Sequence, residues 1–168
     1  IAMLNTFVAP AAGMLGWMGI ERWRSGKPSL LGGASGAVTG LVAVTPAAGI
    51  SGPLGAMLLG LAASAACYSF IAGFKHRMRL DDSLDVFGIH GLGGIVGSIG
   101  TAIVALPVLG GHGGDQYALG AQLVRQLGAV LLAIGWSAAG SAACFGLVRF
   151  AIPLRRDVAF CRRHSVRE

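Results

Sequence analysis

Long uncharged hydrophobic runs alternate with short polar stretches along this chain. Runs of about 18 or more apolar residues are typical of helices that cross a membrane. Five runs predict transmembrane helices at residues 1–20, 30–50, 54–74, 86–109 and 127–148. The pattern therefore predicts an all-α integral membrane protein, with a membrane domain over residues 1–153 and a basic cytoplasmic tail over residues 154–168.

The basic residues fall on one side of these predicted helices. Twelve of the 13 lysines and arginines follow the first, third or fifth segment, and Arg125 falls on the other side. Because basic loops tend to stay in the cytoplasm, we expect the N-terminal end to face outward and the C-terminus to be cytoplasmic. The net charge of +6 then indicates topology in the plasma membrane and contact with anionic lipid, not nucleic acid binding.

Composition agrees with a membrane location. Hydrophobic residues make up 54% of the chain and charged residues 12%, about half of the charged share that is usual in soluble domains. Gly36 with Gly40 and Gly93 with Gly97 form small-xxx-small pairs, which let helix backbones approach closely. The three cysteines lack a C-x-x-C spacing, so we expect no metal site and no cofactor.

His90 is the histidine predicted at membrane depth. An ionisable side chain inside a membrane is costly and indicates a functional site, and a structural histidine bonded to a neighbouring helix is the alternative. Helical spacing places His90 on one face with Val86, Phe87, Gly94, Gly97 and Thr101. Such a face leaves room for a narrow lumen or for a close partner helix.

Three carboxylates precede this segment, at Asp81, Asp82 and Asp85. Carboxylates suit the positive end of a helix dipole, and Asp82 or Ser83 is a candidate N-cap. We therefore assign Asp82 and Asp85 a structural role at the helix start.

Two stretches resemble the ammonium transporter family, which includes the Rhesus proteins. DDSLDVFGIHGLGGIVGSIGTAI (residues 81–103) resembles its D-D-P-x-D-V-F-G-x-H-G-x-x-G-x-x-G signature, and GKPSLLGGASGAVTGLVAVTPAAGISGPLGA (residues 26–56) resembles a second stretch. Asn5-Thr6 also fits an N-T pair of the family. These matches run in order and at the expected spacing.

The resemblance implies the C-terminal half of an eleven-helix transporter whose inverted repeat surrounds a pore. His90 matches the second of the family's two pore histidines, and Val86 matches an apolar pore-lining position one turn below it. The resemblance also implies ammonium or ammonia as the substrate, a homotrimer, a PII-type regulatory protein as a partner at the cytoplasmic face, and no enzymatic activity.

Other interpretations remain open at this point. The chain begins at Ile1 inside a hydrophobic run, which we interpret as a fragment of a longer protein. The family's partner histidine belongs to a segment outside this chain, and the basic tail lacks the family's acidic run. A non-conducting fragment that only assembles with an N-terminal half is therefore an alternative. A haem- or quinone-binding subunit with His90 as axial ligand is another, although such sites usually need two facing histidines.

Overall fold

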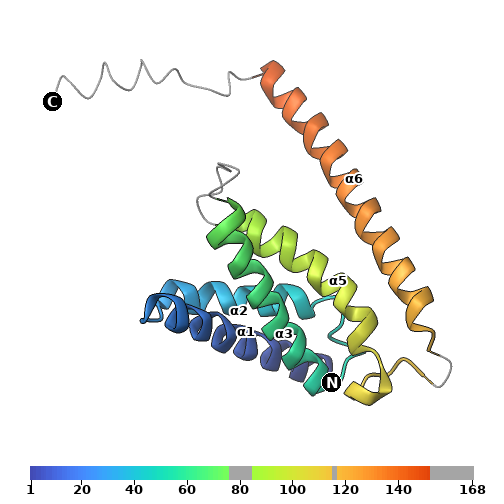
Figure 1. Cartoon of the computed structure of the whole chain (residues 1–168). Helices are drawn as coiled ribbons and strands as arrows, with labels where there is room; N and C mark the ends of the chain where they lie inside the picture. Colours follow the sequence, from blue (N-terminus) through green and yellow to red (C-terminus); the bar gives the residue numbers. More distant parts are fainter. Residues whose placement is uncertain (76–84, 115–116, 152–168) are drawn as a thin grey trace. The chain divides into compact units, whose positions relative to one another are not determined.

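A computed structural model describes residues 1–75, 85–114 and 117–151 of the chain. Two compact units make up the chain, Ile1–Val130 and Leu131–Glu168. The first unit contains the helices α1 (Ala2–Ser25), α2 (Leu30–Val44), α3 (Pro53–Ser69) and α5 (Gly93–Val104), with the π-helices η1 (Phe70–Lys75) and η2 (Phe87–Leu92) and the 3-10 helix η3 (Pro107–Leu109) (Figure 1). α6 (Leu119–Ala151) contains the boundary between the units.

Four helical spans among the described residues are long and apolar enough to cross a membrane: Ala2–Ser25, Pro53–Gly73, Phe87–Val104 and Leu119–Phe150. The remaining predicted segment, residues 30–50, is also helical, but its helix α2 has only 15 residues. At about 1.5 Å per residue, α2 covers roughly 22 Å, less than a hydrocarbon core of about 30 Å.

α2 is shorter than predicted because the helix ends while the apolar sequence continues. Hydropathy predicts a helix to Ile50, whereas residues 45–50 form turns. Pro46 has no amide hydrogen to continue a helix. The amide of Ala47 bonds to the carbonyl of Val44 (2.8 Å), and the amide of Ile50 bonds to that of Ala47 (3.0 Å), both over three residues.

The other boundaries shift for similar local reasons. α5 ends at Val104 instead of Leu109, and Pro107 opens η3. α1 continues beyond residue 20 to Ser25 and stops at Gly26, whose φ of 74° is the left-handed conformation that ends many helices. α6 extends beyond the predicted segment at both ends.

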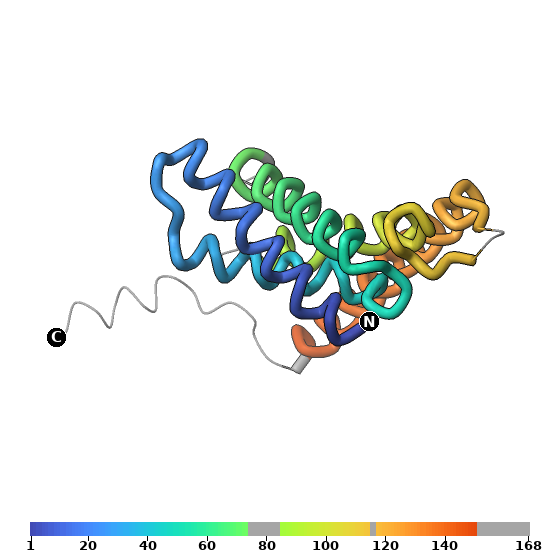
Figure 2. The backbone as a smooth tube through the Cα atoms, turned by 90° about the horizontal axis from the view of Figure 1, so that it is seen from below, coloured from blue at the N-terminus to red at the C-terminus, as the bar shows by residue number. Residues whose placement is uncertain are grey.

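Glycine and alanine bring α1 into close contact with α2 and α3, which lie side by side in Figures 1 and 2. A Cβ atom at Gly40 would lie 2.9 Å from Pro10 Cα, and one at Gly36 would lie 2.6 Å from Gly13 O. From α3, a Cβ at Gly60 would lie 3.2 Å from the carbonyl carbon of Ala9. The close approach predicted from the first small-xxx-small pair is confirmed.

α5 approaches α2 through the second pair. A Cβ at Gly97 would lie 2.7 Å from Ala43 Cα, which leaves no room for a side chain. At Gly93 the nearest atoms would be Val42 Cγ1 at 3.5 Å and Cys67 Sγ at 3.6 Å, an ordinary van der Waals distance. Gly97 alone of this pair is therefore at a backbone-to-backbone contact.

A polar cluster joins the end of α1 to the start of α2. Glu21 Oε2 accepts from the Ser29 amide (2.7 Å), and Glu21 Oε1 accepts from Ser29 Oγ (3.1 Å). Ser29 Oγ in turn accepts from the Gly32 amide (2.8 Å), as an N-cap residue does. This cluster fixes the connection at residues 26–29.

Asn5 holds the opposite end of the bundle. Its side chain is fully buried, and Nδ2 donates to Ala48 O (2.8 Å), Ser51 O (2.8 Å) and Ser51 Oγ (3.2 Å). These bonds satisfy backbone carbonyls of the non-helical connection between α2 and α3. Buried backbone carbonyls outside a helix need such partners, because an unpaired buried polar group is costly.

Candidate functional site

His90 lies in η2, a π-helical turn that leads directly into α5. π-helical turns are rare, and within α-helices they often occur at functional sites. The π turn begins at Phe87, directly after Val86. The amide of Ile89 donates to the carbonyl of Asp85 (2.8 Å). Together with α5, η2 forms the membrane-length span Phe87–Val104.

The predicted face around His90 divides into an open part and a packed part. His90, Val86 and Phe87 are exposed, and a Cβ at Gly94 would have no atom within 4 Å among the described residues beyond its own helical neighbours. Gly97 and Thr101, predicted on the same face, are buried. The wider π turn changes the angular spacing of its residues, so a stripe drawn with α-helical spacing does not continue across it. The predicted face is thus open at His90 and packed at Gly97 and Thr101, and its role in lining a lumen stays a prediction.

A second π-helical turn packs against the first. η1 ends α3, and the Phe70 and Phe87 rings meet with centroids 6.0 Å apart at an angle of 52°. A Cβ at Gly88 would lie 2.7 Å from Ile71 Cγ1. The turn that carries His90 is thus supported from η1 by the aromatic ring of Phe70 and the aliphatic side chain of Ile71, contacts that hydropathy does not predict.

Of the two residues predicted at the helix start, Asp82 and Asp85, the structure describes only Asp85. Asp82 lies outside the described residues, and its capping role stays a prediction. Asp85 has a φ of 56°, a left-handed conformation that aspartate tolerates better than most residues. Asp85 therefore stands at the bend that precedes the helix, and its carbonyl accepts the first helical hydrogen bond, from Ile89.

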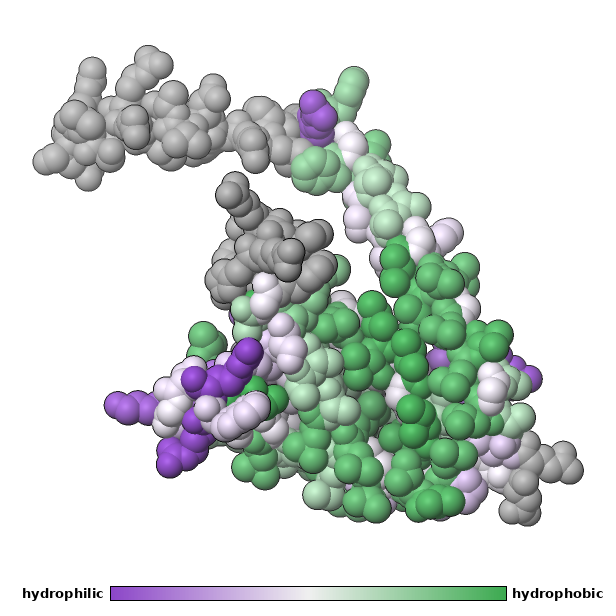
Figure 3. All heavy atoms as spheres, viewed as in Figure 1, coloured by the Kyte–Doolittle hydropathy of each residue, from purple (hydrophilic) through white to green (hydrophobic). Residues whose placement is uncertain are grey.

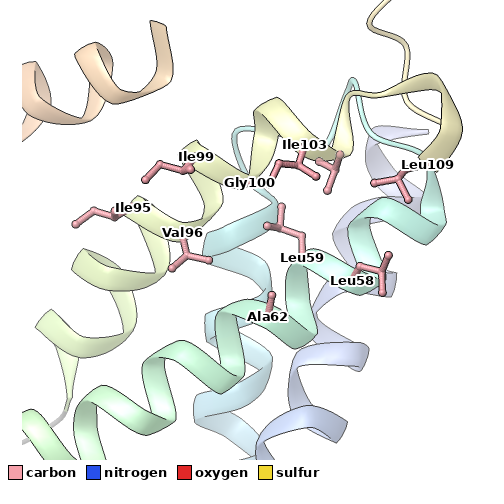
Figure 4. A pocket seen from close by; sticks show the side chains of 10 residues that line it. Leu58, Leu59, Ala62, Ile95, Val96, Ile99, Gly100, Ile103 and Leu109 are labelled. Carbon is pink, nitrogen blue, oxygen red and sulfur yellow. The ribbon is translucent and has the colours of Figure 1, made fainter. Parts of the chain in front are cut away.

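A separate apolar groove of about 360 Å³ lies between α3 and α5. Its walls include Leu58, Leu59 and Ala62 from α3 and Ile95, Ile99 and Ile103 from α5 (Figure 4). His90 is not among its lining residues. These hydrocarbon walls offer no side-chain hydrogen bond, so the groove is unsuited to a small cation.

No group of three or more His, Cys, Asp or Glu side chains that could hold a metal ion occurs within residues 1–75, 85–114 and 117–151. The polar side chain on the exposed part of η2 is the imidazole of His90, and the apolar Val86, four residues earlier at the start of the turn, is also exposed. A neutral imidazole can exchange hydrogen bonds with a small polar molecule, because it has one donor and one acceptor nitrogen.

The helices and their apolar lengths define a multi-pass, all-α membrane protein. The family model for the Ammonium Transporter Family matches residues 1–159, and the chain belongs to that family. The predicted resemblance and fold class are thereby confirmed.

Individual relatives agree. The chain is 41% identical over 154 residues to an ammonium transporter of Aquifex aeolicus, covering 92% of this chain and 36% of that protein. It is 39% identical over 114 residues to an ammonium transporter of Bacillus subtilis, covering 68% and 28%. The crystal structure of Saccharomyces cerevisiae Mep2 matches with a TM-score of 0.77 and 32% identity, over 90% of this chain and 38% of that one. The chain thus spans about a third of the length of the relatives it matches.

Proposed function

We propose that this chain forms part of an ammonium-conducting pore in which His90 acts as a polar relay for ammonia or its proton. Membership of the Ammonium Transporter Family supports the substrate. The observation that carries the site is the exposed imidazole of His90 on a π turn within a membrane-length helix, four residues after the exposed Val86.

The physical chemistry of the substrate favours this assignment. A bare ammonium ion pays a large desolvation cost in an apolar passage, so it gives up a proton before it crosses. The neutral ammonia passes through the pore, and the released proton is carried by the imidazole relay. A neutral imidazole has one donor and one acceptor nitrogen, as a relay requires. Val86 contributes to the dry wall.

The rest of the proposal concerns the complete transporter. Because the chain corresponds to about a third of its relatives' length, we propose that it conducts together with further helices that complete the pore. A non-conducting role is the alternative outcome of the test below. Homotrimer assembly and binding of a PII-type regulator stay predictions from the family resemblance.

Replacing His90 by alanine in the complete transporter is expected to reduce selectivity for ammonium over potassium by about tenfold or more. That factor corresponds to about 1.4 kcal/mol, within the range for losing one hydrogen-bonding group. Ammonium- and potassium-driven currents or fluxes in proteoliposomes measure it. His112→Ala, which changes an exposed histidine in a loop, is the matched control and should leave selectivity unchanged. Unaltered transport and selectivity in His90→Ala would contradict the relay.

We also propose that the end of α1 and the 26–29 connection face the cytoplasm and that the 45–52 connection faces outward. In a background without native cysteines, a cysteine at Ser25 should react with an impermeant maleimide only from the cytoplasmic side. A cysteine at Gly49 should react only from outside, and both positions are exposed. Labelling of both from the same side would overturn the orientation.

A further inference from the structure

A surface patch at the junction of α1 and α2 combines basic and apolar side chains. We define the basic-apolar patch as Arg22, Trp23, Arg24, Lys27, Leu30 and Leu31, all of which are exposed. Hydrophilic residues gather at this end of the two helices in Figure 3, next to hydrophobic ones. We propose that the patch binds the headgroups of anionic phospholipids, with the lipid chains against its apolar members.

The position along α1 sets the depth of the patch. α1 has 24 residues and a length of roughly 36 Å, so its last turn extends beyond a hydrocarbon core of about 30 Å. Arg22 and Arg24 lie in this last turn. The patch therefore sits at headgroup level on the basic side of the membrane.

The basic groups are available for phosphate. Within the described residues no carboxylate forms an ion pair with Arg22, Arg24 or Lys27, and both carboxylate oxygens of Glu21, the nearest acid in the sequence, accept from Ser29. The Arg24 guanidinium lies 5.8 Å from the Tyr68 ring centroid, which holds the cation at the surface. Tyr68 is braced in turn by an edge contact with Trp17 at 5.5 Å.

The apolar members indicate a lipid and not a free phosphate. Trp23 is 87% exposed, Leu30 93% and Leu31 78%. Large apolar side chains at such exposure, interleaved with cations, suit the boundary between headgroups and acyl chains, where tryptophan is enriched. A soluble anion would leave these side chains in contact with water.

The test uses the full chain in nanodiscs, carrying Trp136→Phe so that Trp17 and Trp23 remain. Phosphatidylglycerol or phosphatidylcholine with brominated acyl chains quenches tryptophan fluorescence on contact, and the ratio of quenching constants measures headgroup preference. We expect a preference for phosphatidylglycerol. Arg22→Gln with Lys27→Gln should lower it by about fivefold for each charge removed, which corresponds to about 1 kcal/mol per basic residue.

Matched variants separate the patch from net charge and from misfolding. Arg125→Gln with Arg149→Gln removes the same charge elsewhere and should leave the preference intact, while Arg22→Lys with Lys27→Arg should keep it through charge alone. Excess inorganic phosphate at constant ionic strength should not displace the lipid. Equal quenching by the two lipids in the parent chain, an equal drop in the Arg125/Arg149 variant, or displacement by phosphate would overturn the proposal. These readouts do not depend on whether the pore conducts.

Discussion

Substitution of Gly97 by leucine is expected to separate α5 from α2 and to destabilise the protein by about 3 kcal/mol, the upper end of the usual range for overpacking. The atoms that a side chain would meet belong to the backbone of Ala43, with Cα at 2.7 Å. Backbone atoms inside a helix cannot move aside as the end of a flexible side chain can. The loss is measured as a lowered midpoint of thermal unfolding in detergent.

Gly94→Leu is the matched control, since it makes the same change on the same helix. A Cβ at Gly94 would meet no described atom within 4 Å beyond its own helical neighbours, and leucine favours helices more than glycine does. We expect Gly94→Leu to keep or slightly raise thermal stability. Equal losses in the two variants would show that the contact with Ala43 is not the cause.

Replacement of Asn5 by aspartate is expected to destabilise the protein by about 2–4 kcal/mol despite nearly identical shape. Asn5 Nδ2 donates to two backbone carbonyls, at Ala48 and Ser51, in a fully buried site. Aspartate would place an acceptor against these acceptors, and buried groups left without a partner cost about 1–3 kcal/mol each. Asn5→Ala should lose a similar amount.

Thr6→Ala provides the control for the neighbouring position. Thr6 Oγ1 is exposed and bonds only within its own helix, to Ala2 O at 2.8 Å. Its removal should change thermal stability by no more than about 0.5 kcal/mol. If Asn5→Asp unfolds at the temperature of the parent chain, the carbonyls of the 45–52 connection do not depend on Asn5.

Hydropathy and glycine spacing predicted the parts of the fold that depend on averages over many residues. The helical segments follow from long apolar runs, and the contact of Gly40 with α1 follows from a repeated small residue. The length of an apolar run and the spacing of small residues both remain recognisable when a single position departs from the pattern. The family signature around His90 identified the candidate site because it depends on residue types in a fixed order.

Features that depend on individual hydrogen bonds could not be predicted in this way. Residues 45–50 are apolar enough to extend a helix, but Pro46 and the bonds from Asn5 turn the chain instead. The π turn at His90 is stabilised by contacts from η1, such as that between Phe70 and Phe87, which a local pattern does not contain. An asparagine inside an apolar run was the one available sign that Asn5 had a distant partner.

The π turn has a consequence for how length matters in this segment. Hydrogen bonds in a π-helix run from residue i to i+5, one residue further than in an α-helix, so a one-residue deletion at Gly91 or Leu92 is expected to let this stretch close as an α-helix. Because Gly97 is held against Ala43, a deletion between His90 and Gly97 would change the direction of the imidazole around the helix axis. The number of residues in this stretch therefore sets the orientation of His90 around the helix axis more than its depth along it.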